Sequence, residues 1–233
     1  MLERLNRYLA AHAAIHETLR QPTPLSITIS REAGAGGSAI AQLLATRLTD
    51  AEPALASKPW VVFDANLAKQ VLEDHKLPLK LEAFMTEEAK LPIEDVVEQL
   101  LGLHPSHWTL VQHTTKTILK LASLGHAIIV GRGSAVVTAR LPTVLHVRLV
   151  APLNARLHYI SEHYHISASE AEKMLHEQDD SRRRYLRTYF NADIDNPVLY
   201  DLTLNTGRLS FTRCADLIYH LAREHEEMLP HRS

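Results

Sequence analysis

The chain has 233 residues, of which 45% are hydrophobic, and its formal net charge is −2. This length and composition predict one α/β domain with insertions and a sizeable core. The near-neutral charge argues against a nucleic-acid partner, and no apolar stretch is long enough to indicate a membrane span. The one cysteine, Cys214, can form no internal disulfide, and the N-terminus lacks a signal-peptide pattern, so a cytoplasmic protein is expected.

Residues 2–20 predict an amphipathic helix, because apolar residues recur there at roughly helical spacing. These residues are Leu2, Leu5, Leu9, Ile15 and Leu19. Pro22 and Pro24 end the helix before the first strand begins. Residues 1–24 are therefore expected to form a helical appendage that packs on the domain or on a second copy of the chain as a homodimer contact.

The first predicted strand, 26–30, leads into a glycine-rich turn and a helix over 38–49. Strand, glycine loop and helix in this order are typical of a phosphate-binding loop, in which backbone N–H groups and the helix N-terminus face an anion. Ser38 stands where such a loop places its Mg²⁺-binding hydroxyl, but Gly37 replaces the usual lysine. Arg31 is expected to supply the missing positive charge. The alternative is an ordinary strand-to-helix turn.

A second predicted strand covers 60–63 and ends at Asp64, and a helix follows to about residue 75. Residues 77–106 predict two short helices punctuated by prolines, and residues 107–124 predict a longer helix. The two tryptophans, Trp60 and Trp108, are expected to pack in the core or at a hinge.

The next predicted strand, 127–130, is continuous and apolar, which is typical of a strand buried on both faces. It leads directly into Gly131-Arg132-Gly133. Ligands of open α/β sheets bind at the carboxyl ends of strands, so Arg132 is expected to swing toward a phosphate there. The alternative is a tight turn that carries a solvated arginine.

A strand over 144–150 and a helix that begins near Pro152 precede a long helix from Ser167 or Ser169 to about residue 190. Arg182, Arg183, Arg184 and Arg187 concentrate positive charge near the end of this long helix. Such a cluster, folded over a nucleotide, would neutralise a transferring phosphoryl group and exclude water. The alternative is a solvated face stabilised by ion pairs with Asp179 and Asp180.

The last predicted strand is 202–205, and the last helix begins at Ser210 and ends near residue 227. Five strands that alternate with helices predict a mainly parallel sheet covered on both faces.

The motifs ITISREAGAGGSAIAQLLATRL, IIVGRGSAVV and DDSRRRYLRTYFNADIDNPVLYDLTLNTGRLS, in this order, resemble the cytidylate kinase-like family over residues 25–222. The resemblance implies a P-loop NTPase-type three-layer αβα kinase domain over 25–233. It also implies a helical insertion that binds a nucleoside monophosphate, about 65–106, and an arginine-bearing LID, about 170–190. The implied reaction transfers phosphate from ATP, with Mg²⁺, to a nucleoside monophosphate, with CMP or dCMP preferred.

Carried over by position, the resemblance implies three groups of site residues. The ATP phosphates would lie on Gly34, Ala35, Gly36, Gly37 and Ser38, with Arg31 beside them and Ser38 on the metal. The acceptor would be bound by Asp64, Arg132, Arg156 and Asp201. Catalytic charge would come from Arg132, Arg182, Arg183 and Arg187.

Two departures from the family pattern keep other functions open. Gly37 stands for the loop lysine, and Gly133 stands for the aspartate of the G-R-D motif of bacterial cytidylate kinases. Both departures favour a nucleotide-binding module without catalysis as the alternative to an enzyme. A kinase of another small molecule is the third hypothesis.

Overall fold

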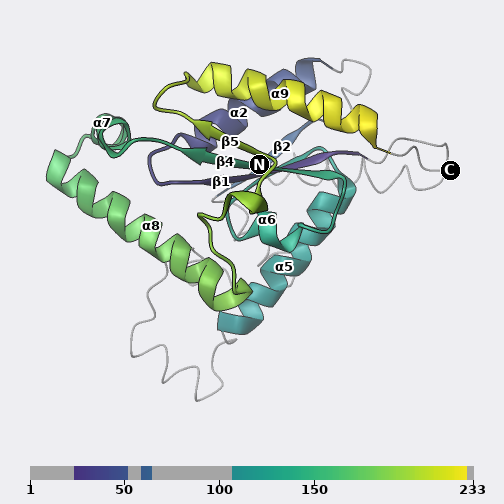
Figure 1. Ribbon diagram of the computed structural model, residues 1–233, viewed down its shortest axis with the longest axis horizontal. Helices are drawn as coiled ribbons and strands as arrows, with labels where there is room; N and C mark the ends of the chain where they lie inside the picture. The colour runs from purple at the N-terminus through teal and green to yellow at the C-terminus, as the bar shows by residue number, and fades with distance from the viewer. Residues whose placement is uncertain (1–23, 52–58, 65–106, 230–233) are drawn as a thin grey trace.

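In the computed structural model, the structure describes residues 24–51, 59–64 and 107–229 (Figure 1). The sequence-based expectations for the N-terminal helix and for the insertion at 65–106 lie outside these ranges. Five strands form one parallel sheet in the order β2-β3-β1-β4-β5. They are β1 (Ser26–Arg31), β2 (Val61–Phe63), β3 (Ala127–Val130), β4 (Val144–Val150) and β5 (Leu202–Asn205).

Helices cover both faces of the sheet, as Figure 1 shows. On one face α2 (Gly37–Asp50) and α9 (Phe211–Met228) share a core with β1, β3 and β4 that includes Ile40, Leu44 and Ile218, all fully buried. On the other face α5 (His107–Leu124) contributes Ile118 and Leu121 to a second core, and α6 (Ser134–Val137) lies beside it. The predicted three-layer α/β architecture with a five-stranded parallel sheet is confirmed.

The central strands carry apolar residues in both alternating sets because both faces are covered. All four residues of β3 are buried, and Ile27 and Ile29 of β1 are fully buried. In register, Ile29 pairs with Val130 of β3 and Val147 of β4. The carboxyl ends of these three strands therefore lie together, and the glycine loop and the Gly131–Gly133 turn emerge from this edge.

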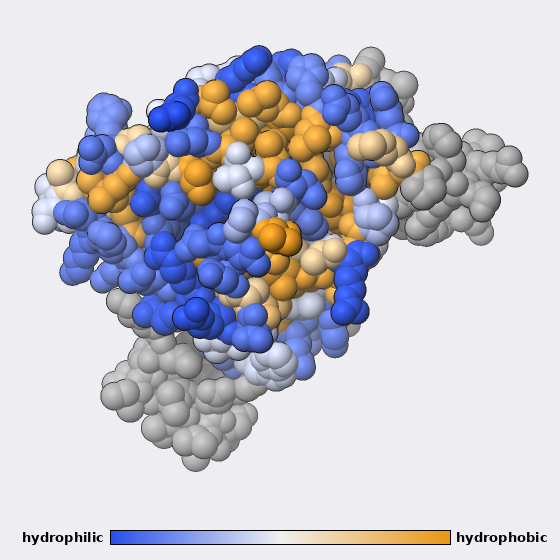
Figure 2. Space-filling view, in the orientation of Figure 1, coloured by the Kyte–Doolittle hydropathy of each residue, from blue (hydrophilic) through white to orange (hydrophobic). Residues whose placement is uncertain are grey.

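Two helices, α7 (Leu153–Tyr164) and α8 (Ala168–Phe190), project from that edge. A capping box between Ser167 and Glu170 begins α8, and Asn191 ends it in the left-handed conformation. Figure 1 shows α8 descending from α7 to the N-terminal end of α5, and Figure 2 shows hydrophilic side chains gathered over it. The short helix η3 (Pro197–Leu199) then leads to β5.

The helix and strand boundaries predicted from the sequence agree with the structure over the described ranges. The two tryptophans differ in exposure: Trp60 is buried, at 8%, whereas Trp108 is 53% exposed. Of the two placements predicted for Trp108, packing in the core is therefore wrong, and packing at a hinge stays a prediction. Among the helices that the structure describes, none combines the length and the apolar character needed to cross a bilayer.

Candidate functional site

The glycine loop between β1 and α2 adopts a conformation that requires glycine at two positions. Gly34 and Gly36 have φ angles of 75° and 78°, in the left-handed region. A Cβ atom on Gly36 would lie 2.3 Å from the ring of Phe211, and one on Gly34 would lie 3.0 Å from Cβ of Arg156. The loop is thus shaped by its glycines and enclosed by α7 and α9.

The N-terminus of α2 is open toward an anion. Helix α2 begins at Gly37, and no side-chain hydrogen bond caps it within the described part of the chain. Backbone N–H groups of a first helical turn have no partner inside the helix, and the helix dipole adds partial positive charge there. The N–H of Ala35 is used within the loop, donating to Glu32 O at 3.2 Å. The remaining loop and first-turn N–H groups would form the expected phosphate cradle, which stays a prediction.

Ser38 and Asp64 bring two oxygen ligands to the edge of this cradle. Asp64 follows β2, and its carboxylate accepts a short hydrogen bond from the Ser38 hydroxyl. Mg²⁺ prefers hydroxyl, carboxylate and phosphate oxygens, and P-loop proteins hold it with one hydroxyl and one aspartate. The chemistry of the pair fits the expected Mg²⁺ ion on Ser38, with Asp64 beside it; the acceptor contact expected of Asp64 stays a prediction.

Charged side chains from α7 and α8 hold the loop from outside. Asp179 of α8 accepts hydrogen bonds from the Ala33 N–H at 2.7 Å and from Arg156 Nη1 at 2.6 Å. Arg156 also donates to the carbonyls of Ala33, at 3.2 Å, and of Ala151, at 3.0 Å. Glu32 accepts from the Ala151 N–H at 2.8 Å. The structure places Arg156, expected at the acceptor, in this brace.

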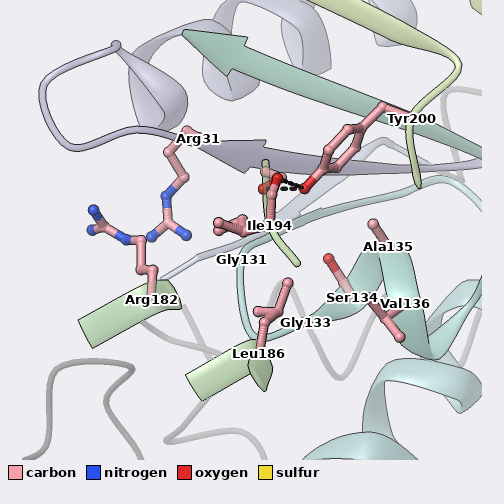
Figure 3. Close-up of a pocket in the computed structure, with 11 residues that line it drawn as sticks. Arg31, Gly131, Gly133, Ser134, Ala135, Val136, Arg182, Leu186, Ile194 and Tyr200 are labelled. Carbon is pink, nitrogen blue, oxygen red and sulfur yellow. Dashed lines mark hydrogen bonds between the residues drawn. The ribbon is translucent and has the colours of Figure 1, made fainter. Parts of the chain in front are cut away.

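A pocket opens beside the loop, between the ends of β1 and β3, α6 and α8 (Figure 3). Its wall combines basic, hydroxyl and aliphatic side chains with the backbone of the Gly131–Gly133 turn. The lining residues are Ser30, Arg31, Gly131, Gly133, Ser134, Ala135, Val136, Arg182, Leu186, Ile194 and Tyr200. Figure 3 shows Arg31 descending from the end of β1 and Arg182 rising from α8 toward the same end of the pocket.

Arg31 occupies the space that the missing lysine leaves. A Cβ atom on Gly37 would lie 3.0 Å from Cγ and 3.3 Å from Cδ of Arg31. The aliphatic part of Arg31 therefore covers Gly37, and its guanidinium group continues into the pocket. A side chain at residue 37 would therefore require Arg31 to move by a few tenths of an ångström.

The pocket floor rests on a buried arginine that the sequence analysis missed. Arg148 of β4 has a side chain 5% exposed, and it donates to Ser30 Oγ and to Asp195 Oδ1, both at 3.0 Å. The Tyr200 hydroxyl lies 3.2 Å from Ser30 Oγ and 2.8 Å from the Ile194 carbonyl. Burial raises the pKa of Tyr200 above its usual value, so the hydroxyl stays protonated. The sequence signal for this buried residue was a charged side chain, Arg148, within the mostly apolar strand β4.

The four predicted catalytic arginines lie in different surroundings. Arg182 lines the pocket, its side chain is 7% exposed, and its Nη1 atom lies 3.5 Å from Asp179 Oδ1. Arg183 is exposed and binds Asp195, which is the main reason that its pKa is raised, at an Nε–Oδ2 distance of 3.0 Å. Arg187 is exposed on the surface of α8.

Arg132 differs from the expected mobile arginine. It is 8% exposed and has a φ of 59°, between Gly131 and Gly133, which are also left-handed. A Cβ on Gly133 would lie 2.7 Å from the Phe190 ring. This ring therefore fills the space that the side chain of an aspartate at residue 133 would need. Among the described residues, therefore, the turn presents backbone to the pocket and an aromatic ring beside it.

Asp201 lies apart from these groups. Its carboxylate accepts a hydrogen bond of 2.7 Å from the backbone N–H of His146, and its own N–H donates to the His146 carbonyl at 2.8 Å. These two bonds extend the pairing of β5 with β4 by one residue. The structure does not bring Asp201 to the pocket lining, and its expected acceptor contact stays a prediction.

A five-stranded parallel sheet in this order, with a glycine loop after the central strand, a hydroxyl–aspartate pair and an arginine-bearing helix, defines a P-loop NTPase-type fold of the kinase kind. Residues 26–208 match the profile of the cytidylate kinase-like family, so the chain belongs to that family.

Individual relatives are distant. A cytidylate kinase of Haloquadratum walsbyi is 32% identical over 74 residues, which is 32% of this chain and 38% of that protein. A uronate isomerase of Corynebacterium glutamicum is 26% identical over 109 residues, which is 47% of this chain and 21% of that protein. The chain thus spans well under half the length of either curated relative.

A solved structure shares the fold. An uncharacterised protein from Eubacterium ventriosum superimposes with a TM-score of 0.62 at 16% identity, over 85% of this chain and 98% of that one. A shikimate kinase from Acinetobacter baumannii, solved with shikimate, gives a TM-score of 0.46 at 15% identity, over 87% and 95% of the two chains.

Proposed function

We propose that this protein is a kinase that transfers the γ-phosphoryl group of ATP to a nucleoside monophosphate, with CMP and dCMP as the first acceptors to test. The observation that carries the proposal is the convergence of Arg31 and Arg182 on one pocket at the carboxyl edge of the sheet. Two guanidinium groups beside a phosphate cradle suit a reaction in which charge spreads over phosphoryl oxygens. Membership of the cytidylate kinase-like family supports the same reaction class.

In this proposal, the glycine loop would bind ATP and the pocket would bind the acceptor. The glycine cradle and the α2 N-terminus would bind the β- and γ-phosphates of ATP, and Ser38 with Asp64 would hold Mg²⁺. When bound, Mg²⁺ would neutralise phosphate charge. The acceptor phosphate would lie in the pocket between Arg31 and Arg182. Because the Arg31 stem covers Gly37 and its guanidinium group lines the pocket, Arg31 would lie between the two phosphate sites and take over the role of the lysine.

Burial strengthens the contribution of Arg182. Its side chain is 7% exposed, so its charge acts with less screening than that of a solvated arginine. Asp179, at 3.5 Å, orients the guanidinium group without the close pairing that it gives to Arg156. Arg182 also donates to Gln178 Oε1 at 3.2 Å, so its guanidinium group is held at the pocket lining from two sides, whereas Arg183 is held by two exposed aspartates.

The test combines a substrate screen with a matched pair of variants. Purified protein would be incubated with ATP, Mg²⁺ and each of CMP, dCMP, UMP, AMP and GMP, and products would be separated by chromatography. We expect Arg182→Lys to lower kcat by about 100-fold, because an ammonium group cannot make the two-pronged phosphate contact. The control is Arg184→Lys on the exposed side of α8, where the guanidinium group contacts Ser181. We expect this control to keep wild-type kcat.

The second candidate is a nucleotide-binding module without catalysis, which Gly37 and Gly133 favour. It predicts tight ATP binding, measured by calorimetry, with no product from any monophosphate. A kinase of another small molecule would also fail in the monophosphate screen, but it would turn over ATP with a different acceptor. Equal activity of Arg182→Lys and Arg184→Lys would remove Arg182 from the proposed mechanism.

A further inference from the structure

An exposed pair of stacked aromatic rings lies where α5 and α8 meet. Trp108, in the first turn of α5, is 53% exposed, and its ring centroid lies 6.3 Å from that of Tyr189, with 26° between the planes. Tyr189 also stacks on His107 at 5.9 Å, and its hydroxyl lies 2.9 Å from His107 Nδ1. We call Trp108, Tyr189 and His107 the aromatic shelf. The contacts of Tyr189 with His107 fix the orientation of the Tyr189 ring, and the indole of Trp108 is exposed to solvent.

The aromatic shelf is continuous with the pocket wall. Tyr189 and Phe190 pack in one apolar cluster with Leu186, Ile194 and Val136. The last three residues line the pocket. The Phe190 ring also covers Gly133, another lining residue. Packed apolar side chains, of which Leu186 and Ile194 are buried, therefore join the pocket wall to the shelf.

The geometry of α8 sets the distance between Arg182 at the pocket and Tyr189 in the aromatic shelf. Arg182, Leu186 and Tyr189 are spaced i, i+4 and i+7, so they follow one face of the helix. Seven residues at a rise of 1.5 Å separate Arg182 from Tyr189 by about 10 Å along the axis. This separation is comparable to the length of a nucleoside monophosphate from its phosphate to its base.

We infer that the aromatic shelf receives the base of the acceptor nucleotide by stacking it on Trp108. The inference rests on the proposed function and names the part of the protein that binds the acceptor base. Stacking recognises the face of a base and not its hydrogen-bonding edge, so the shelf would bind purine and pyrimidine monophosphates alike. Removing a stacking ring costs about 1–3 kcal/mol in other systems, which corresponds to about 5- to 150-fold in affinity.

Tryptophan fluorescence can report on this site once the second tryptophan of the chain is replaced. That residue is Trp60, which is 8% exposed. In a Trp60→Phe variant, Trp108 is the sole indole. We expect CMP and AMP to quench its emission and to protect it from acrylamide. Ribose 5-phosphate, which carries the phosphate without the base, should bind without quenching. Free N-acetyltryptophanamide corrects for light absorbed by the nucleotides.

Calorimetry on the otherwise unchanged chain provides a second measurement if Trp60→Phe does not fold. Trp108→Ala should weaken CMP and AMP binding by about 10-fold or more and leave ribose 5-phosphate binding unchanged. Trp108→Phe should restore most of the loss. Leu119→Ala, at a partly exposed apolar residue of the same helix (36% exposed), is the control and should change neither affinity.

The outcomes separate this inference from the proposed function. Base-dependent quenching without phosphoryl transfer would support the shelf and overturn the kinase. Phosphoryl transfer with unchanged nucleotide affinity in Trp108→Ala would support the kinase and overturn the shelf. Blue-shifted emission of Trp108 that no nucleotide alters would also overturn the shelf, because the indole would then pack against protein.

Discussion

Replacing Asp179 with asparagine tests the brace that joins α8 to the phosphate loop. The substitution keeps the shape of the side chain and removes its charge. The carboxylate now accepts from the Ala33 N–H at 2.7 Å and from Arg156 Nη1 at 2.6 Å, and the Asp179 and Arg156 side chains are each 11% exposed. An amide oxygen can keep one of these bonds, while its NH₂ group offers a second donor to a site that needs an acceptor.

The expected loss follows from these contacts. A hydrogen bond to a charged group contributes about 1.5–3 kcal/mol, and a nearly buried guanidinium group that loses its partner adds to the cost. We expect Asp179→Asn to lower the free energy of unfolding by about 2–4 kcal/mol. For a domain of this size, that loss corresponds to a fall in Tm of about 4–16 °C.

Urea denaturation followed by circular dichroism would measure the change, with thermal melting as a second readout. The control is Asp180→Asn, one residue further along α8. Asp180 is 62% exposed and pairs with Arg183 at 3.2 Å, and such surface pairs contribute about 0–1 kcal/mol. If the two variants lose the same free energy, or if Asp179→Asn loses under about 0.5 kcal/mol, then the brace does not stabilise the fold and the reasoning is refuted.

Two further predictions concern the metal site and the centre of the sheet. Ser38→Ala should weaken ATP binding with Mg²⁺ far more than binding in EDTA, measured by calorimetry; equal losses would mean that the hydroxyl serves only the start of α2. Burial lowers the pKa of His146 below 6.5, so the folded protein holds this imidazole neutral and the unfolded chain takes up the proton more readily. The free energy of unfolding should therefore fall as pH drops below about 6.5, because the unfolded chain then binds the proton that the folded protein does not. His146→Asn should flatten this part of the urea-midpoint profile, and a profile parallel to wild type would contradict the assignment.

The local pattern of the sequence determined the elements and the phosphate loop. Continuous apolar β-branched runs fix buried strands, and the glycines before Ser38 fix a loop in which side chains do not fit. The alternation of strands with helices then allows few arrangements, since parallel strands need crossovers of one hand. These signals act over a few residues, so one sequence suffices to recognise them.

The tertiary structure alone decided which charged side chains act together. Asp179 lies 146 residues after Ala33, and the packing of α8 against the loop joins them; Glu32 lies 119 residues before Ala151, and the pairing of β1 with β4 brings these two together. The arginine-rich run of α8 looks uniform in sequence, yet the rotation of the helix buries Arg182 at the pocket and leaves Arg187 in solvent. Residue type sets the charge that each position carries, but burial and distance set what the charge can reach.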